Sequence, residues 1–306
     1  MSTPAVHPAP TPRVVMVDGV PMSGLFARVP EPRATIVAIH GGATTSAYFD
    51  CPGHPRLSLL RLGAQLGFSV LALDRPGFGS SALYADEFAD TARRVEMTYG
   101  AVDKILGERE RGAGLFLLGH SAGCELALRM AVEPRGTDVL GIEISGTGLH
   151  QQAAALAMLS SASLERPPTG LRELLWQPAH LYPDDIAKSV RIRGGPPGAR
   201  YETKVITTWT NTLPELAARV DIPVRYTLAE YERVWQNGPD ALAEVAALFT
   251  TSPRVLTNQQ DNGGHNLSLG HIAAAYHLSA LAFAEECAVG RKTATSATTD
   301  YNVEAS

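Results

Sequence analysis

The sequence has little cysteine, no signal-like leader and no long apolar run. Among 306 residues there are three cysteines, Cys51, Cys124 and Cys287, too few and too dispersed for a disulfide framework or a zinc site. Such a low count fits a reducing compartment, and the first residues, MSTPAVHPAPTPR, lack the basic and apolar regions of a secretory signal. The longest weakly polar run, at 153–164, is shorter than the roughly 20 residues that cross a bilayer. We therefore expect a cytoplasmic protein with no membrane contact.

The charge balance excludes a broadly basic nucleic-acid-binding surface. Lys and Arg number 26 against 31 Asp and Glu, a formal net charge of −5 with His neutral, whereas nucleic-acid binding needs clustered positive charge. The excess is also too small for an acidic tail or a disordered polyelectrolyte. No nucleic-acid partner is therefore expected.

Short apolar runs alternate with helical patterns along the chain. Segment 14–29 is typical of two strands around a turn at Asp18-Gly19. The later runs are rich in β-branched residues, as in strands buried on both faces of a parallel sheet. Strands are predicted at 34–40, 69–74, 115–120, 139–145, 223–229 and 253–258, and helices at 56–66, 88–110, 122–133, 240–249 and 265–288. This alternation predicts an α/β fold with a doubly wound, mostly parallel sheet of about eight strands.

One long gap interrupts the alternation between the strands at 139–145 and 223–229. It holds several short helical patterns with breakers at Pro167-Pro168 and at 194–197. Structureless loops of this length are rare in compact domains, so we expect an inserted helical cap or lid, with a few extra packing helices as the alternative. The expected divisions are a disordered tail at 1–12, a core at 13–148 and 221–290, the cap at 149–220 and a second disordered tail at 291–306.

The segment LFLLGHSAG at 115–123 places a serine between a predicted buried strand and a predicted helix. Gly119 and Gly123 flank Ser121 in the pattern G-x-S-x-G, in which small residues allow a sharp, strained turn that lifts the hydroxyl above the sheet edge. The helix N-terminus beside the hydroxyl favours developing negative charge. Ser121 is therefore the candidate nucleophile, and the alternative is that it only caps the helix.

Four motifs occur in the order in which α/β-hydrolase-fold proteins carry them. Through these motifs the chain resembles that family from about residue 14 to 288. IHGGATTS at 39–46 stands where that family keeps its His-Gly oxyanion loop, and LDRPGFGSS at 73–81 matches the family's Asp-x-x-Gly-x-Gly-x-Ser turn. The serine turn follows, and then GGHN at 263–266 after the last predicted strand. The resemblance implies a serine-nucleophile member of this superfamily that needs no metal and no organic cofactor.

A nucleophilic serine needs a base, because a free hydroxyl is barely ionised at neutral pH. By resemblance the base is His265, which follows two glycines after the final strand and opens the C-terminal helix. The other histidines are weaker candidates. His40 belongs to the oxyanion loop, His120 to the serine turn, and His271 and His277 lie further along the same helix.

The acid that orients the base is expected after the penultimate strand. The family pattern there is Gly, two residues, then Asp, but this chain has AEYE at 229–232, with Ala for Gly and Glu for Asp. Glu232 falls at the expected offset and Glu230 is its rival, and both are solvated loop charges in the alternative interpretation. The resulting chain order of nucleophile, acid and base is that of this fold. Two further acid candidates are Asp261 and Glu143.

An oxyanion hole needs two N–H donors aimed at the carbonyl oxygen that becomes charged. By resemblance these are the backbone amides of Gly42 and Ala122, with Ala43 as the rival of Gly42. Asp74 and Arg75 are interpreted as residues that brace the neighbouring loop, and contact of Arg75 with substrate is the alternative.

Three aromatic residues of the expected cap, Trp176, Tyr182 and Trp209, are candidates for the wall of a substrate pocket, although simple packing within the cap also explains them. Cys124 lies one helical turn past the serine and is interpreted as a small buried apolar residue.

The leading hypothesis is a serine hydrolase that cleaves an ester or thioester of a small organic substrate through an acyl-enzyme. Relatives that open epoxides or displace halide use Asp at the nucleophile position, so Ser121 argues against both. Two alternatives remain open. One is a same-fold enzyme that performs carbon–carbon cleavage, acyl transfer to an alcohol or elimination, and the other is a non-catalytic ligand receptor on the same fold.

Overall fold

Eight strands form one sheet in the spatial order β1-β2-β4-β3-β5-β6-β7-β8. The computed structural model describes residues 9–107, 111–160, 170–186 and 201–304. The strands are β1 (Thr11–Val17), β2 (Val20–Ala27), β3 (Thr35–Ile39), β4 (Ser69–Leu73), β5 (Leu115–His120), β6 (Val139–Ser145), β7 (Val224–Tyr231) and β8 (Val255–Gly264). The sheet confirms the predicted fold class.

The sheet is parallel except at the end that carries β1 and β2. These two strands pair antiparallel as a hairpin around Asp18 and Gly19, and β2 pairs antiparallel with β4. From β4 to β8 all pairings are parallel. Every residue of β3, β4, β5 and β6 is buried, because helices cover both faces, and this explains why these strands are nearly continuous apolar runs in the sequence.

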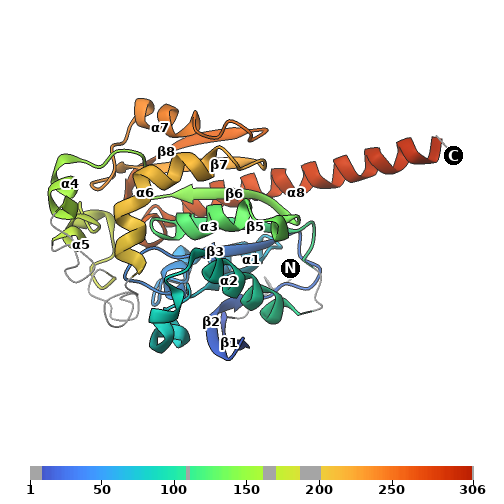
Figure 1. Ribbon diagram of the computed structural model, residues 1–306, viewed down its shortest axis with the longest axis horizontal. Coiled ribbons are helices and arrows are strands. Elements are labelled where there is room, and N and C mark those ends of the chain that lie inside the picture. The colour runs from blue at the N-terminus through green and yellow to red at the C-terminus, as the bar shows by residue number, and fades with distance from the viewer. Residues whose placement is uncertain (1–8, 108–110, 161–169, 187–200, 305–306) are drawn as a thin grey trace, which may run out of the picture.

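Helices cover both faces of the sheet (Figure 1). The side chains between helices and sheet form a separate apolar cluster on each face. One cluster joins α2, α3 and α7 to one face, and the other joins α1 and α8 to the opposite face. The α-helices are α1 (Leu59–Gln65), α2 (Thr91–Leu106), α3 (Gly123–Ala131), α4 (Ala153–Ser160), α5 (Leu171–Leu174), α6 (Tyr201–Ala217), α7 (Pro239–Ala246) and α8 (Ala273–Glu304). The 3-10 helices are η1 (Ser46–Phe49), η2 (Pro55–Leu57), η3 (Gly79–Phe88), η4 (Pro134–Gly136), η5 (Ala179–Leu181) and η6 (Leu267–Leu269).

The chain between β6 and β7, here called the insertion (149–220), contributes α4, α5, η5 and α6. Figure 1 shows these helices grouped on the side of the sheet toward which β6 points. The Tyr201 hydroxyl at the start of α6 donates to the Pro76 carbonyl at 2.7 Å, and α6 also contacts α3. Both predicted breakers, at 167–168 and 194–197, lie outside the described residues.

Several expected boundaries differ from the structure. Strand β8 was expected to end at 258 but continues to Gly264, because an edge strand with one neighbour needs no apolar run. The expected tail at 1–12 includes residues 11 and 12, which belong to β1. The expected tail at 291–306 is also not what the structure shows, since α8 continues through 291 to Glu304 and projects from the body (Figure 1). Once a helix has a packed start, each further residue adds one hydrogen bond without new nucleation.

Candidate active site

The turn between β5 and α3 holds Ser121 in a left-handed backbone conformation, with φ of 52°. Its N–H donates to the Ser145 carbonyl at 2.8 Å, which attaches the turn to the end of β6. A Cβ at Gly123 would lie 2.4 Å from the Ile39 carbonyl oxygen and 2.5 Å from that of His40, so α3 begins against the end of β3 only because this position is glycine. The G-x-S-x-G pattern thus forms the strained strand-to-helix turn that its residues predict.

Three side chains from distant segments form one chain of hydrogen bonds. His265 Nε2 lies 3.3 Å from Ser121 Oγ, and His265 Nδ1 lies 2.9 Å and 3.0 Å from the two carboxylate oxygens of Glu232. His265 is 2% exposed and Glu232 is 1% exposed. One Glu232 oxygen also accepts the backbone N–H groups of Arg233 at 3.0 Å and Val234 at 2.9 Å. Both the carboxylate and the imidazole are therefore fixed from more than one direction.

The surroundings of Glu232 keep its carboxyl group ionised. Burial by itself raises the pKa of Glu232, but the electrostatic attraction and hydrogen bond to His265, with backbone N–H groups of Val234 and Trp235, outweigh burial and hold the pKa below its usual value. A carboxylate accepts but does not donate, so His265 carries its proton on Nδ1 and presents the Nε2 lone pair to the serine hydroxyl.

The other acid candidates do not meet the imidazole. Glu230 accepts the backbone N–H of Asn262 at 2.8 Å, and Asp261 is exposed. Glu143 is fully buried within β6 and pairs with Arg225 on β7 at 2.7 Å. Of the four carboxylates weighed from the sequence, Glu232 alone is hydrogen-bonded to the imidazole.

The register of β7 against β8 explains why this glutamate meets the histidine. The pairing shifts just before it ends, and its last pair is Tyr231 with Gly264. The residues that directly follow on these two parallel strands are Glu232 and His265, so they leave the sheet side by side at the same edge. Without the shift, another residue of the polar end of β8 would stand opposite Glu232.

Two further histidines lie beside this chain of hydrogen bonds and are neutral. His40 Nδ1 donates to the Gly41 carbonyl at 2.8 Å, and its Nε2 accepts the Arg75 backbone N–H at 3.0 Å. The ring of His120 stacks on that of Tyr48 at 4.6 Å between centroids. Burial lowers the pKa of both imidazoles well below the usual value. They therefore shape the site without titrating near neutral pH.

The backbone segments predicted to bind an oxyanion open onto the same cavity as the serine. Gly42, Ala43 and Ala122 all line it. Ala122 immediately precedes α3, and Ala43 has a positive φ of 51°. The structure thus brings the three candidates to the reacting end of the cavity, and the choice between Gly42 and Ala43 stays a prediction.

Asp74 and Arg75 brace the loop that carries this segment. The Asp74 carboxylate accepts the Ser46 backbone N–H at 2.7 Å and the Ser23 hydroxyl at 2.5 Å. Arg75 Nη2 donates to the Gly41 carbonyl at 2.8 Å and forms a buried ion pair with Glu202 of α6. This ion pair ties the insertion to the loop, and Arg75 itself does not line the cavity.

Glu202→Gln is expected to lower the free energy of unfolding by about 3–5 kcal/mol, because it leaves the Arg75 guanidinium buried without its counter-charge. The two side chains are 2% and 11% exposed for Arg75 and Glu202. The matched control is Glu286→Gln, which breaks a pair with Arg254 whose members are about half exposed and is expected to cost less than about 1 kcal/mol. Urea denaturation of both variants measures the difference, and equal losses would contradict the structural role of the Arg75–Glu202 pair.

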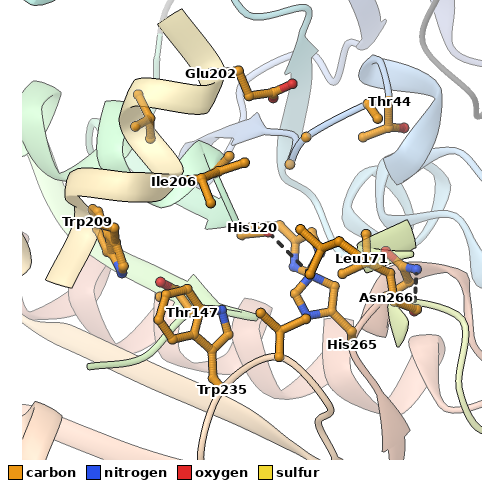
Figure 2. A pocket seen from close by; sticks show the side chains of 18 of the residues that line it. Thr44, His120, Thr147, Leu171, Glu202, Ile206, Trp209, Trp235, His265 and Asn266 are labelled. Carbon is orange, nitrogen blue, oxygen red and sulfur yellow. Dashed lines mark hydrogen bonds between the residues drawn. The ribbon is translucent and has the colours of Figure 1, made fainter. Parts of the chain in front are cut away.

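The cavity beside Ser121 has a volume of about 280 Å³ and lies between the carboxyl ends of the parallel strands and the insertion (Figure 2). Of the three predicted aromatic residues, Trp176 and Trp209 line it. Tyr182 does not, because it is buried beneath the wall, where its hydroxyl accepts the Asn266 backbone N–H at 3.2 Å. The other lining side chains from the insertion are Leu159, Leu171, Leu175, Glu202, Thr203, Val205 and Ile206.

Sequence reasoning missed several core residues that line the cavity. Thr44, Thr147, Val234 and Trp235 all face it. Each follows the carboxyl end of a parallel strand, which is where ligands bind in open α/β sheets, so position after a strand was the available signal.

Metal-binding and membrane-spanning features are absent from the described parts of the chain. They contain no group of three or more His, Cys, Asp or Glu side chains placed to hold a metal ion, and none of their helices is long and apolar enough to cross a bilayer. The three cysteines are buried and free. Burial also raises the pKa of the Cys124 thiol, as expected for a small apolar residue.

Comparison with known families agrees with this fold. The sequence matches the Alpha/beta hydrolase family over residues 36–285, and the chain belongs to that family. The resemblance inferred from the four motifs is thereby confirmed. A comparison with curated protein sequences finds no match.

Similar solved structures include three proteins of this fold. A carboxyl esterase from Bacillus coagulans has a TM-score of 0.66 and 18% identity, covering 92% of this chain and 99% of its own. A thioesterase domain from the curacin biosynthetic pathway has a TM-score of 0.59 and 20% identity, covering 90% and 100%. A monoacylglycerol lipase from Paleococcus ferrophilus has a TM-score of 0.58 and 19% identity, covering 87% and 99%. At these identities the likeness is one of fold.

Proposed function

We propose that this chain is a serine hydrolase that cleaves an ester or thioester of a small organic substrate through an acyl-enzyme intermediate. The observation that carries the proposal is the continuous hydrogen-bonded chain from Ser121 through His265 to the buried Glu232 at the wall of a cavity. A nucleophile, a base and an orienting acid within hydrogen-bond reach are what acyl transfer needs.

In this proposal Ser121 Oγ attacks the substrate carbonyl while His265 Nε2 accepts its proton. The backbone N–H groups of Gly42 and Ala122 stabilise the oxyanion, and Glu232 stabilises the imidazolium that forms. His265 then delivers the proton to the leaving alcohol or thiol, and water activated by the same imidazole releases the carboxylic acid. These steps need no metal and no organic cofactor.

The cavity supports a small organic molecule as the substrate. Its volume of about 280 Å³ lies just below the roughly 300–1,000 Å³ typical of sites for drug-sized ligands. The insertion lines it mainly with apolar side chains. The carboxyl esterase, thioesterase domain and monoacylglycerol lipase named above are catalysts of this class by their names, which favours an acyl–oxygen or acyl–sulfur bond as the one cleaved.

The remaining expectations belong to the same proposal. The net charge of −5 supports a small-molecule partner rather than nucleic acid or a membrane surface. The three free, buried cysteines support a cytoplasmic location, where thiols stay reduced. The cavity-lining helices of the insertion support its interpretation as a cap over 149–220.

A fluorophosphonate probe tests the nucleophile directly. We expect covalent modification of the wild type at Ser121, located by peptide mass spectrometry, because an activated serine attacks the probe. Ser121→Ala should not be labelled, whereas Ser160→Ala, which removes an exposed hydroxyl, should label like the wild type. Absence of label at Ser121 would contradict the assignment.

Turnover of p-nitrophenyl esters separates hydrolysis from the other reactions of this fold. We expect release of nitrophenol from at least one chain length. Labelling of Ser121 without turnover of any chain length would instead favour carbon–carbon cleavage, acyl transfer or elimination. A non-catalytic receptor would keep its ligand affinity and its signalling output in Ser121→Ala.

A further inference from the structure

Trp209 lines the cavity with a buried side chain whose indole N–H has no hydrogen-bond partner among the described residues. The side chain is 4% exposed. Figure 2 shows the indole directed away from α6, toward the side of the cavity where Thr147 and Trp235 lie. A buried donor left without an acceptor costs free energy that a bound ligand can recover.

The donor lies far from the reacting end. Glu202, on the same face of α6, contacts the oxyanion segment, since a Cβ at Gly42 would lie 3.1 Å from Glu202 Oε1. Trp209 stands seven residues further along α6, two helical turns or about 10 Å. A group bound by its N–H therefore belongs to a part of the substrate remote from the scissile carbonyl.

The charge of the cavity restricts the kind of acceptor. Of the lining side chains that the structure describes, Glu202 alone carries a formal charge. Its partner Arg75 lies behind it, outside the lining, so the negative end of the ion pair faces the cavity. No described lining side chain is a Lys or Arg, so a carboxylate or phosphate on the substrate would be buried without a counter-charge, whereas an uncharged oxygen needs none.

We propose that Trp209 is a specificity-determining residue whose indole N–H donates a hydrogen bond to an uncharged oxygen of the substrate, remote from the scissile carbonyl. The preferred substrates are then small, mostly apolar esters or thioesters that carry a keto or hydroxyl oxygen in the chain. A plain alkyl chain leaves the buried donor unpaired and is discriminated against, as at other sites built to bind a polar group. The ester or thioester bond in this inference rests on the proposed function, whereas the hydrogen bond from Trp209 does not depend on it.

Calorimetric binding to the full-length Ser121→Ala variant tests the contact without turnover. The ligands are neutral p-nitrophenyl alkanoates of one fixed length in which each chain methylene in turn is replaced by a carbonyl. We expect the ester with its carbonyl at one particular chain position to bind about tenfold more tightly than the all-carbon ester. Adding Trp209→Phe should abolish that preference, while the matched control Trp176→Phe, another tryptophan of the same wall, should keep it.

The proton NMR signal of the Trp209 indole N–H in Ser121→Ala gives a second readout that does not depend on the folding of Trp209→Phe. The chain has three tryptophans, so the signals missing from Trp176→Phe and Trp235→Phe identify that of Trp209. We expect it to move downfield with the preferred ligand and not with the all-carbon ester. Equal affinities along the series, or a preference that survives Trp209→Phe, would overturn the inference.

These results are distinguishable from failure of the proposed function. Labelling and ester turnover at Ser121 with a flat binding series would remove only the role of Trp209. A position-specific preference in a protein whose Ser121 cannot be labelled would keep the binding contact and reject the hydrolase.

Discussion

Ser121→Ala is expected to lower kcat/KM about 10⁴–10⁶-fold for any ester that the wild-type protein hydrolyses. The loss follows from removal of the attacking oxygen, and the oxyanion donors and substrate binding leave the residual rate. Initial rates with p-nitrophenyl esters, at enzyme concentrations high enough to exceed the uncatalysed rate, measure it.

The fold should not change in this variant, which makes the kinetic result interpretable. Alanine accepts the positive φ of position 121, 52°, at about the same cost as serine, so we expect the free energy of unfolding to change by less than about 0.5 kcal/mol. Ser160→Ala serves as the control for the loss of a hydroxyl elsewhere. A variant that folds and keeps more than a tenth of the wild-type rate would rule out Ser121 as the nucleophile.

Glu232→Gln is expected to lower kcat about 10³–10⁴-fold. The amide lacks the negative charge that stabilises the imidazolium, and its NH₂ group can force His265 into the wrong tautomer. Glu232→Asp keeps the charge but shortens the side chain by one methylene, so we expect a smaller loss. Steady-state kinetics of the three proteins, with urea unfolding of each, separate catalysis from stability.

Glu230→Gln is the matched control for this prediction, because Glu230 is the rival acid and lies in β7, two residues before Glu232. Its carboxylate accepts the Asn262 backbone N–H and does not reach His265, so we expect activity within about threefold of the wild type. A large loss in Glu230→Gln together with a small one in Glu232→Gln would reverse the assignment.

The features that the sequence predicts correctly are those that depend on residues close together along the chain. Gly119, Ser121 and Gly123 form their turn because a short stretch of chain contains both the strain and the small residues that relieve it. The buried strands were recognisable because both of their faces are covered, so each reads as an apolar run.

The features that the sequence does not predict depend on contacts between distant segments. The polar end of β8 is extended because it pairs with β7, and nothing in its own composition indicates a strand. The helical continuation of 291–304 follows from the packed start of α8 rather than from any periodicity of its own. Tyr182 is a candidate pocket residue by sequence, yet its hydroxyl lies beneath the wall and accepts the Asn266 backbone N–H.

By itself the sequence determined the class of fold, the turn that carries Ser121 and the identity of His265 as its partner in the motif order. Only the tertiary structure showed that Glu232 rather than Glu230 contacts the imidazole, because the register shift of β7 against β8 brings the former beside it. It alone also showed that Trp209 lines the cavity and that its buried indole N–H has no partner among the described residues. The reason is the same in both cases: a side chain's hydrogen-bond partners are set by which segments lie next to each other, and the local pattern of residues does not contain that information.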